Sequence, residues 1–120
     1  MAEYRIERLG QRIQEKIGSL VLEGIVKDPR VSSFNSITRV EVSRDLSYAD
    51  VYVSDIRENA NLEKSAQGLQ SASGFIQSQL GAVLKIRKIP YLRFHADTSI
   101  REGFDLVQKI DKLTMSNEEK

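Results

Sequence analysis

The sequence predicts a single α+β domain, in which a three-stranded sheet carries helices on one face. Three observations lead to this fold class. Apolar residues recur at helical spacing near the N-terminus and again between residues 61 and 84. Apolar and polar residues alternate, as in strands, within residues 39–54 and 91–95. The length of 120 residues fits one domain of ~100–150 residues, and the 40% hydrophobic content can fill one core.

The first helix is predicted over about residues 4–25. Its apolar residues follow in steps of three and four: Ile6, Leu9, Ile13, Ile17, Leu20 and Val21. At ~100° per residue, one flank of this stripe carries four cations: Arg5, Arg8, Arg12 and Lys16. Arg8 over Arg12 places like charges four residues apart, which costs a few tenths of a kcal/mol. The flank is interpreted either as an anion-binding surface or as an ordinary solvated helix face.

A hairpin follows the first helix. Pro29 disfavours helical geometry at Asp28, and a loop is expected through Asn35. The two alternating runs, 39–42 and 48–54, are joined by the short connection 43–47. The aliphatic face should be covered by helices, while the face with Tyr48 and Tyr52 should meet water.

A broken helix pair is predicted from Asn61 to Leu84. Its helical spacing is interrupted at Ala72-Ser73-Gly74, and glycine costs ~1 kcal/mol inside a helix relative to alanine. Gly74 is therefore predicted to mark a kink, in a conformation or a close helix approach that a β-carbon would oppose.

A third strand and a last helix complete the fold. After Pro90, Leu92 and Phe94 should point inward, and Arg93 and His95 outward. Asp97 or Ser99 can cap a final helix, since Ser99 and Glu102 have capping-box spacing, and its apolar stripe is Phe104, Val107 and Ile110. Residues 1–113 are assigned to the domain and residues 114–120 to a short polar tail.

The cations are unevenly distributed. The net charge is only +1, from 18 cations and 17 anions, yet residues 81–95 contain Lys85, Arg87, Lys88 and Arg93 and no carboxylate. The first three are expected at the end of the second helix of the pair. This window is a candidate anion-binding patch, with a solvated face as the alternative.

Several classes of protein are excluded or disfavoured. The absence of cysteine excludes disulfides, thiolate metal sites and thiol catalysis, and suits a reducing, cytoplasmic location. No stretch approaches the ~18 apolar residues of a membrane span, and the N-terminus does not resemble a signal peptide. A single His95 provides no metal site, and Gly68 and Gly74 fit no nucleotide-binding fingerprint. No cofactor, metal or small-molecule substrate is expected.

The order of elements and five sequence blocks carry a family resemblance. Helix, strand, strand, broken helix pair, strand and helix match a KH-type RNA-binding fold. The blocks are KDPR at 27–30, VSRDLSYADVYV at 42–53, ASGFI at 72–76, PYLRF at 90–94, and DTS at 97–99 with Gly103. In this order and spacing they resemble the bacterial ribosome-binding factor A family over residues 4 to about 110.

The resemblance implies a KH domain in which an Ala-x-Gly kink, here Ala72-Ser73-Gly74, replaces the usual Gly-x-x-Gly loop. It implies a monomeric, non-catalytic factor that binds the small (30S) ribosomal subunit and its 16S ribosomal RNA. Such factors act in late maturation and rRNA processing and matter most for growth in the cold. Many members carry a longer charged C-terminal extension, whereas this chain stops at Lys120, so the resemblance does not extend to a tail-mediated contact.

The RNA-facing residues are predicted on the kink and on the two basic segments: Arg5, Arg8, Arg12, Lys16, Ser73, Lys85, Arg87, Lys88 and Arg93. Three alternatives remain open at this point. A generic single-strand RNA-binding KH module would stack bases on Tyr48 or Tyr52. A protein-interaction module would use an exposed strand edge, and a small hydrolase would use His95 and Asp97.

Overall fold

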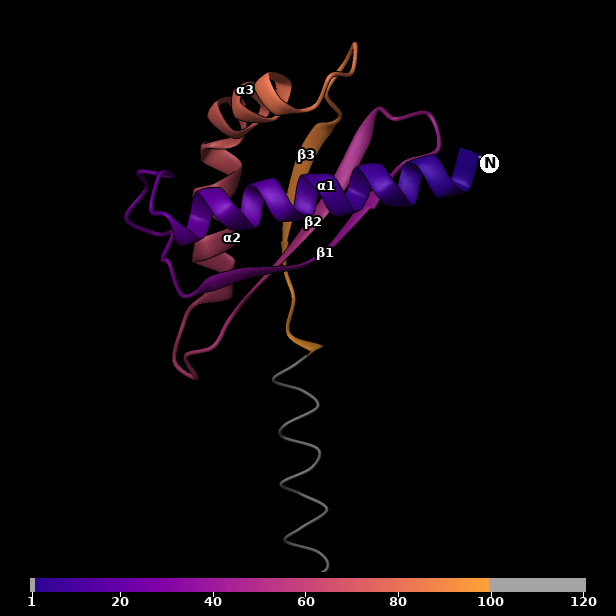
Figure 1. Ribbon diagram of the computed structural model, residues 1–120. Helices are drawn as coiled ribbons and strands as arrows, with labels where there is room; N and C mark the ends of the chain where they lie inside the picture. The colour runs from indigo at the N-terminus through magenta and orange to yellow at the C-terminus, as the bar shows by residue number, and fades with distance from the viewer. Residues whose placement is uncertain (1, 100–120) are drawn as a thin grey trace, which may run out of the picture.

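The computed structural model describes residues 2–99 and has the predicted order of helices and strands (Figure 1). The elements are α1 (Ala2–Leu22), β1 (Asn35–Val42), β2 (Tyr48–Asp55), α2 (Leu62–Ser71), α3 (Ser73–Val83) and β3 (Tyr91–Ala96). The α+β fold class is thus confirmed. The predicted final helix with Phe104, Val107 and Ile110, and the tail at 114–120, lie outside the described residues.

The sheet has the strand order β1-β2-β3. β1 and β2 pair antiparallel, with Val40 opposite Val51, and β3 pairs parallel to β2, with Phe94 opposite Val51. A parallel pair needs a long crossover, which α2 and α3 provide. β2 is therefore the central strand, and β1 and β3 are the edge strands.

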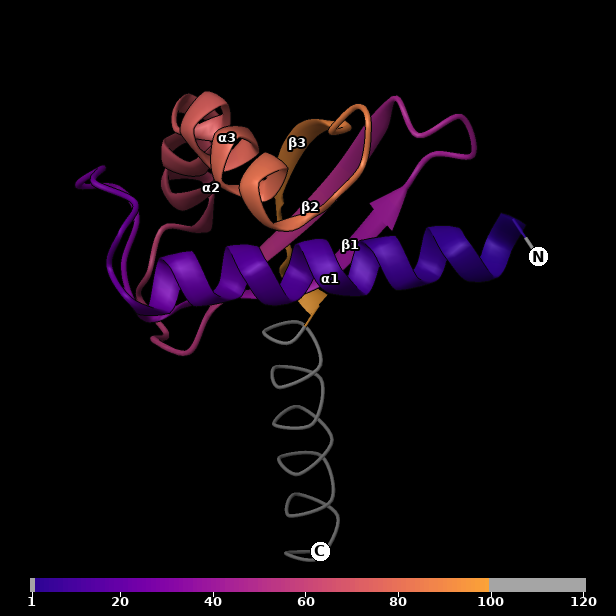
Figure 2. The same cartoon turned by 45° about the horizontal axis from the view of Figure 1, so that its top comes forward.

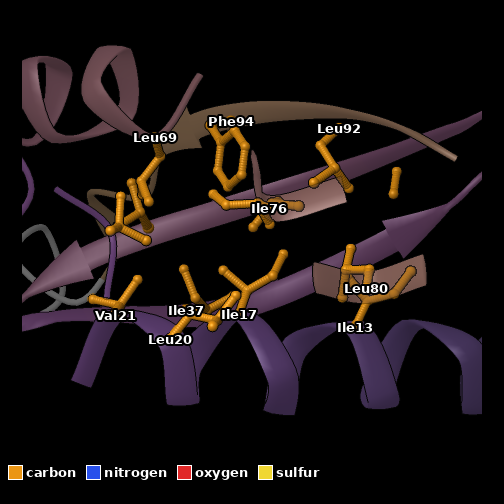
Figure 3. Packing of buried hydrophobic residues seen from close by; sticks show 14 of the residues in the cluster. Ile13, Ile17, Leu20, Val21, Ile37, Leu69, Ile76, Leu80, Leu92 and Phe94 are labelled. Carbon is orange, nitrogen blue, oxygen red and sulfur yellow. The ribbon is translucent and has the colours of Figure 1, made fainter. Parts of the chain in front are cut away.

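The core lies between the sheet and the three helices (Figures 2 and 3). The predicted inward residues of β2 and β3 are buried, as are the apolar stripe of α1 from Leu9 onward and the inner faces of α2 and α3. Figure 3 labels ten of these side chains: Ile13, Ile17, Leu20, Val21, Ile37, Leu69, Ile76, Leu80, Leu92 and Phe94. The opposite sheet face, with Tyr48, Arg93 and His95 exposed or half-exposed, meets solvent as predicted. In the described part of the chain no helix is long and apolar enough to span a membrane.

Helix α1 ends at Leu22, three residues before the predicted end. Gly24 adopts a left-handed conformation with φ of 70°. Its N–H donates to Val21 O at 3.1 Å, and the N–H of Ile25 donates to Leu20 O at 3.0 Å. These two hydrogen bonds form a Schellman motif, so the glycine ends the helix where apolar spacing alone would extend it.

Strand β1 begins at Asn35, where the sequence predicted loop. The register shifts between Ile37 and Arg39, which leaves Thr38 as an extra residue in a bulge. Inward residues therefore change from odd to even positions along β1, from Ile37 to Val40. The strand was predicted only from Arg39 onward because the bulge breaks the alternation on which that prediction relied.

The break in the helix pair lies at Ala72, not at Gly74. Ala72, with φ of −89° and ψ of 5°, joins the two helices, and Gly74 lies within the first turn of α3. A β-carbon on Gly74 would meet nothing within 4 Å. The junction lies within the segment Ala72-Ser73-Gly74, but the reason given for Gly74 is wrong, because nothing lies near it and its φ is not positive.

A buried polar cluster holds the ends of β1 and β2 against α2. The carboxylate of Asp55, with a fully buried side chain, accepts from Asn35 Nδ2 at 3.0 Å and from Arg57 Nη2 at 2.8 Å. Asn35 Nδ2 also donates to Ser65 Oγ on α2 at 3.2 Å, and Asn35 Oδ1 accepts from the N–H of Ser32 at 2.8 Å. Four segments thus meet in one hydrogen-bonded cluster.

Candidate nucleic-acid interface

A groove of about 620 Å³ opens beside the N-terminal half of α1. Its walls come from α1, from the connection between β1 and β2, and from the segment between α3 and β3. The lining consists of four arginines and four aliphatic residues: Arg5, Arg8, Arg12, Arg44, Ile6, Leu9, Leu46 and Ile86. The part of the lining that the structure describes contains no carboxylate, so the groove is positively charged and suited to bind an anion.

Three of the four groove arginines were predicted from the flank of the first helix. Arg5, Arg8 and Arg12 are exposed, while Leu9 beside them is buried against the sheet. Burial of the apolar stripe fixes the rotation of α1 and so points this flank at the groove. Arg44 was missed, because it belongs to the short connection after β1, where no periodicity identifies a partner surface.

The connection 43–47 is held in shape by Asp45. Its Oδ1 accepts from Ser47 Oγ at 2.6 Å, from Ser43 Oγ at 2.8 Å and from the N–H of Ser47 at 3.1 Å. These hydrogen bonds, that from the Ser47 hydroxyl first, lower the pKa of the Asp45 carboxyl to about 2. The pKa of Asp45 in the folded protein lies below its value in the unfolded chain. The stabilisation from its hydrogen bonds is therefore present above ~pH 4 and is lost as the pH falls toward the folded pKa.

The second basic segment lies beyond the end of α3. The helix ends at Val83, so Lys85, Arg87 and Lys88, predicted at the end of this helix, occupy the loop between it and β3. All three are exposed, and Ile86 between them lines the groove. The two predicted basic segments are therefore adjacent in space.

We call this surface the basic end of the molecule and define it by seven cations: Arg5, Arg8, Arg12, Arg44, Lys85, Arg87 and Lys88. Figures 1 and 2 both show the start of α1, the β1–β2 connection and the α3–β3 loop at the same end of the fold. Residues far apart in the sequence are thus concentrated in one place.

Three predicted site residues lie elsewhere. Lys16 is half-buried on α1 and is not part of the groove lining. Ser73 and the kink lie at the opposite end of α3 from the basic loop, roughly 16 Å along the 11-residue helix. A smaller hollow of about 310 Å³ lies beside the kink and is lined by Ile25, Lys27, Asp28, Ser71, Ala72 and Phe75.

Arg93, the third of these residues, is engaged on the exposed face of the sheet. Its Nε and Nη2 donate to Asp50 at 2.9 and 3.0 Å, and its guanidinium carbon lies 4.6 Å from the centre of the Tyr48 ring. His95 Nε2 lies 2.8 Å from the same carboxylate. Partial burial opposes ionisation of Asp50, but the hydrogen bonds from His95 and Arg93 outweigh it and lower the pKa of this carboxyl.

Tyr48 and Tyr52, the two tyrosines considered as stacking platforms, each have one ring face covered. The Arg39 guanidinium lies 4.1 Å from the centre of the Tyr52 ring, and Arg93 lies over Tyr48. A base stacking on either covered face would first have to displace an arginine. Around Tyr48 and Tyr52, the solvent-facing side of the sheet is therefore occupied by paired side chains.

The two residues of the hydrolase alternative have separate partners. His95 pairs with Asp50, whereas the Asp97 carboxylate accepts from Thr38 Oγ1 at 2.6 Å and from the N–H of Ser99 at 3.0 Å. The hydrogen bonds from Ser99 and Thr38 lower the pKa of Asp97. Asp97 thus accepts the backbone N–H of Ser99, two residues further along, as a helix cap would. Among residues 2–99, no cluster of three or more histidine or acidic side chains could hold a metal ion.

Comparisons with known proteins show which family this chain resembles. Residues 5–113 match the family model described as ribosome-binding factor A. The chain is 48% identical over 113 residues to ribosome-binding factor A of Treponema denticola, covering 94% of this chain and 86% of that protein. It is 43% identical over 115 residues to the Dictyoglomus thermophilum protein of the same name, covering 96% and 95%.

Solved structures show the same fold. The crystal structure of ribosome-binding factor A from Thermus thermophilus matches with a TM-score of 0.65 at 23% identity, over 76% of this chain and 93% of that chain. A homology model of the Thermus thermophilus factor, fitted into a cryo-EM map of a 30S complex with that factor, matches with a TM-score of 0.53 at 23% identity, over 72% and 93%. From the match across residues 5–113 and the identity to these relatives, the chain belongs to the ribosome-binding factor A family.

Proposed function

We propose that this chain is a non-catalytic assembly factor that binds the small ribosomal subunit through phosphates of its 16S ribosomal RNA, using the basic end. The observation that carries the proposal is how the arginines are partnered. Four arginines outside the basic end are held by carboxylates, in the pairs Arg30–Asp28, Arg39–Glu41, Arg57–Asp55 and Arg93–Asp50. Within residues 2–99, six of the seven basic-end cations form no ion pair: Arg5, Arg8, Arg12, Lys85, Arg87 and Lys88.

This difference matters because the chain has a net charge of only +1. A nearly neutral protein attracts a polyanion only where its cations are concentrated and are not already neutralised by its own carboxylates. The names of the relatives support a ribosomal partner, and a Thermus thermophilus relative was placed in a map of a complex with 30S. In this proposal the chain acts as a monomer in the cytoplasm, during late maturation of the small subunit and rRNA processing. Its activity is needed most for growth in the cold.

A generic single-strand RNA-binding module is the second candidate. It would need free aromatic faces or a clamping loop for successive bases. Tyr48 and Tyr52 have arginines over them, Tyr91 packs edge-on against Tyr48, and the helix junction offers Ala72 and Gly74 in place of a two-glycine loop. These contacts favour recognition of phosphates at the basic end over a run of stacked bases on the sheet.

The first test removes two arginines from α1. Arg8→Gln with Arg12→Gln should lower the slope of log affinity for small subunits against log salt by about two units. Binding releases about one counterion for each phosphate contact, and the variant lacks two such contacts. Thermal stability should stay unchanged or rise slightly, since like charges four residues apart are removed. Lys64→Gln, an exposed cation on α2 outside the basic end, is the control and should keep the parental slope. Parental binding by the double variant would mean that α1 does not face RNA.

The second test concerns the loop before β3. Lys85→Gln, Arg87→Gln and Lys88→Gln together should lower the same slope by roughly two to three units. The melting temperature should change little, because all three side chains are exposed and lie outside the helix. Binding measured at a series of salt concentrations gives the slope, and thermal unfolding gives the stability. A triple variant with the parental slope would place the RNA surface elsewhere on the domain.

A further inference from the structure

The groove in the basic end has an apolar floor that phosphate binding alone does not require. Ile6 and Ile86 are half-buried, and Leu46 is 41% exposed at its edge. An aliphatic surface left open among four arginines is the pattern of a binding site whose ligand has both an apolar and an anionic part. Its volume of about 620 Å³ is within the ~300–1,000 Å³ typical of sites for small ligands.

Leu46 is held in place at the edge of this floor. It has φ of 61°, the one positive value found for a non-glycine residue in the described chain. Leucine rarely adopts this conformation, which glycine and asparagine accept more easily. The N–H of Leu46 donates to Ser43 O at 3.0 Å, and the neighbouring Asp45 carboxylate accepts from the hydroxyls of Ser43 and Ser47. The connection thus presents Leu46 and Arg44 to the groove in a preorganised form.

From these contacts we propose that the groove receives an unpaired RNA base, with the arginines at its rim holding the adjoining phosphates. This inference rests on the proposed function and adds the class of RNA that the basic end selects. Guanidinium groups both bind phosphate oxygens and stack on base planes, so Arg8 and Arg12 suit either part of a nucleotide. Ile6, Leu46 and Ile86 supply the apolar contact for the base.

A double helix would not use this floor. In A-form RNA the bases are stacked and paired inside, and a protein meets mainly phosphates and 2′-hydroxyls. Those polar groups would gain no partners from the aliphatic side chains of the groove. A single-stranded nucleotide can turn its base into the groove while its phosphates stay at the rim. The basic end therefore selects a single-stranded element, such as a loop or a chain end.

The test uses Leu46→Asn, which removes the apolar side chain but suits the left-handed conformation. The probes are a single-stranded oligoribonucleotide and a blunt duplex with the same number of phosphates. Leu46→Asn should weaken binding of the single strand about tenfold, as expected for one lost base contact. Duplex binding and the salt slope should be unchanged, because no cation is altered. Ile56→Asn, at a 78%-exposed isoleucine after β2 and outside the groove lining, is the matched control and should change nothing.

The outcomes separate this inference from the proposed function. If Leu46→Asn binds the single strand like the parent while Arg8→Gln with Arg12→Gln weakens it, the basic end still binds RNA and the base site is wrong. Equal weakening for single strand and duplex also contradicts the base site. If Leu46→Asn loses binding to intact small subunits but not to the oligonucleotide, the floor contacts a protein of the subunit instead. If neither variant weakens binding to small subunits, the proposed function fails as well.

Discussion

Asp55→Ala is expected to lower the free energy of unfolding by roughly 2–4 kcal/mol, because buried donors lose their acceptor. The Asp55 side chain is fully buried and accepts from Asn35 Nδ2 at 3.0 Å and from the Arg57 N–H at 2.8 Å. Each buried donor left without a partner costs about 1–3 kcal/mol. Urea or thermal unfolding of the variant measures the loss.

A matched control exists within the same chain. Asp28 and Arg30 repeat the local geometry of Asp55 and Arg57: the arginine N–H and Nε donate to one carboxylate oxygen and Nη2 donates to the other. The Asp28 side chain is 17% exposed, against full burial for Asp55. Asp28→Ala should therefore cost clearly less than Asp55→Ala. Equal losses would show that the local Asp-x-Arg turn, and not the buried cluster, provides the stability.

The pH dependence of the Asp28 pair follows from its titration. Hydrogen bonds from the Arg30 side chain and backbone lower the pKa of Asp28 to about 2. Its contribution to stability is present above the unfolded value of ~4 and is lost as the pH falls through the folded one. Asp28→Ala and the parent should thus converge in stability below about pH 2.

Most of the fold could be predicted because the sequence signals are local. The alternation of Ala49, Val51 and Val53 indicates which face of β2 is buried, and those three side chains are buried. The stripe of α1 is equally regular. Its end at Leu22 was missed, since a left-handed glycine closes the helix through hydrogen bonds that apolar spacing does not reveal. The bulge at Thr38 was missed for a similar reason, because one inserted residue reverses the alternation.

The candidate site was only half predictable, since partners distant in the sequence decide which cations are available. Arg93 and Lys85 look alike in a window without carboxylates, yet Asp50, 43 residues before Arg93, takes up its guanidinium. That pairing follows from the parallel register of β2 and β3, in which Asp50 lies opposite Arg93. A strand pairing of this kind brings together residues that no local pattern connects.

Gly68→Val is expected to lower the free energy of unfolding by about 1–3 kcal/mol, whereas Gly74→Val should leave stability at or slightly above the parental value. A β-carbon on Gly68 would lie 2.9 Å from Val31 Cγ2, 3.0 Å from Arg30 Cβ and 3.0 Å from Asp28 Oδ1. The loop that supplies these atoms is tied to α2 by the hydrogen bond from Arg30 Nη2 to Ser71 Oγ, at 3.0 Å. It cannot retreat without losing that contact.

The paired glycine variants separate a close approach from a helix break. Both residues lie in the helix pair, and valine is a slightly better helix former than glycine at either position. Only Gly68 has a neighbouring segment against it, so packing alone makes the two substitutions differ in sign. Thermal unfolding of both variants, with small-subunit binding measured alongside, gives the comparison. A loss of stability in Gly74→Val as large as that in Gly68→Val would mean that the junction at Ala72 depends on the glycine after all, since open space around Gly74 provides no other cause.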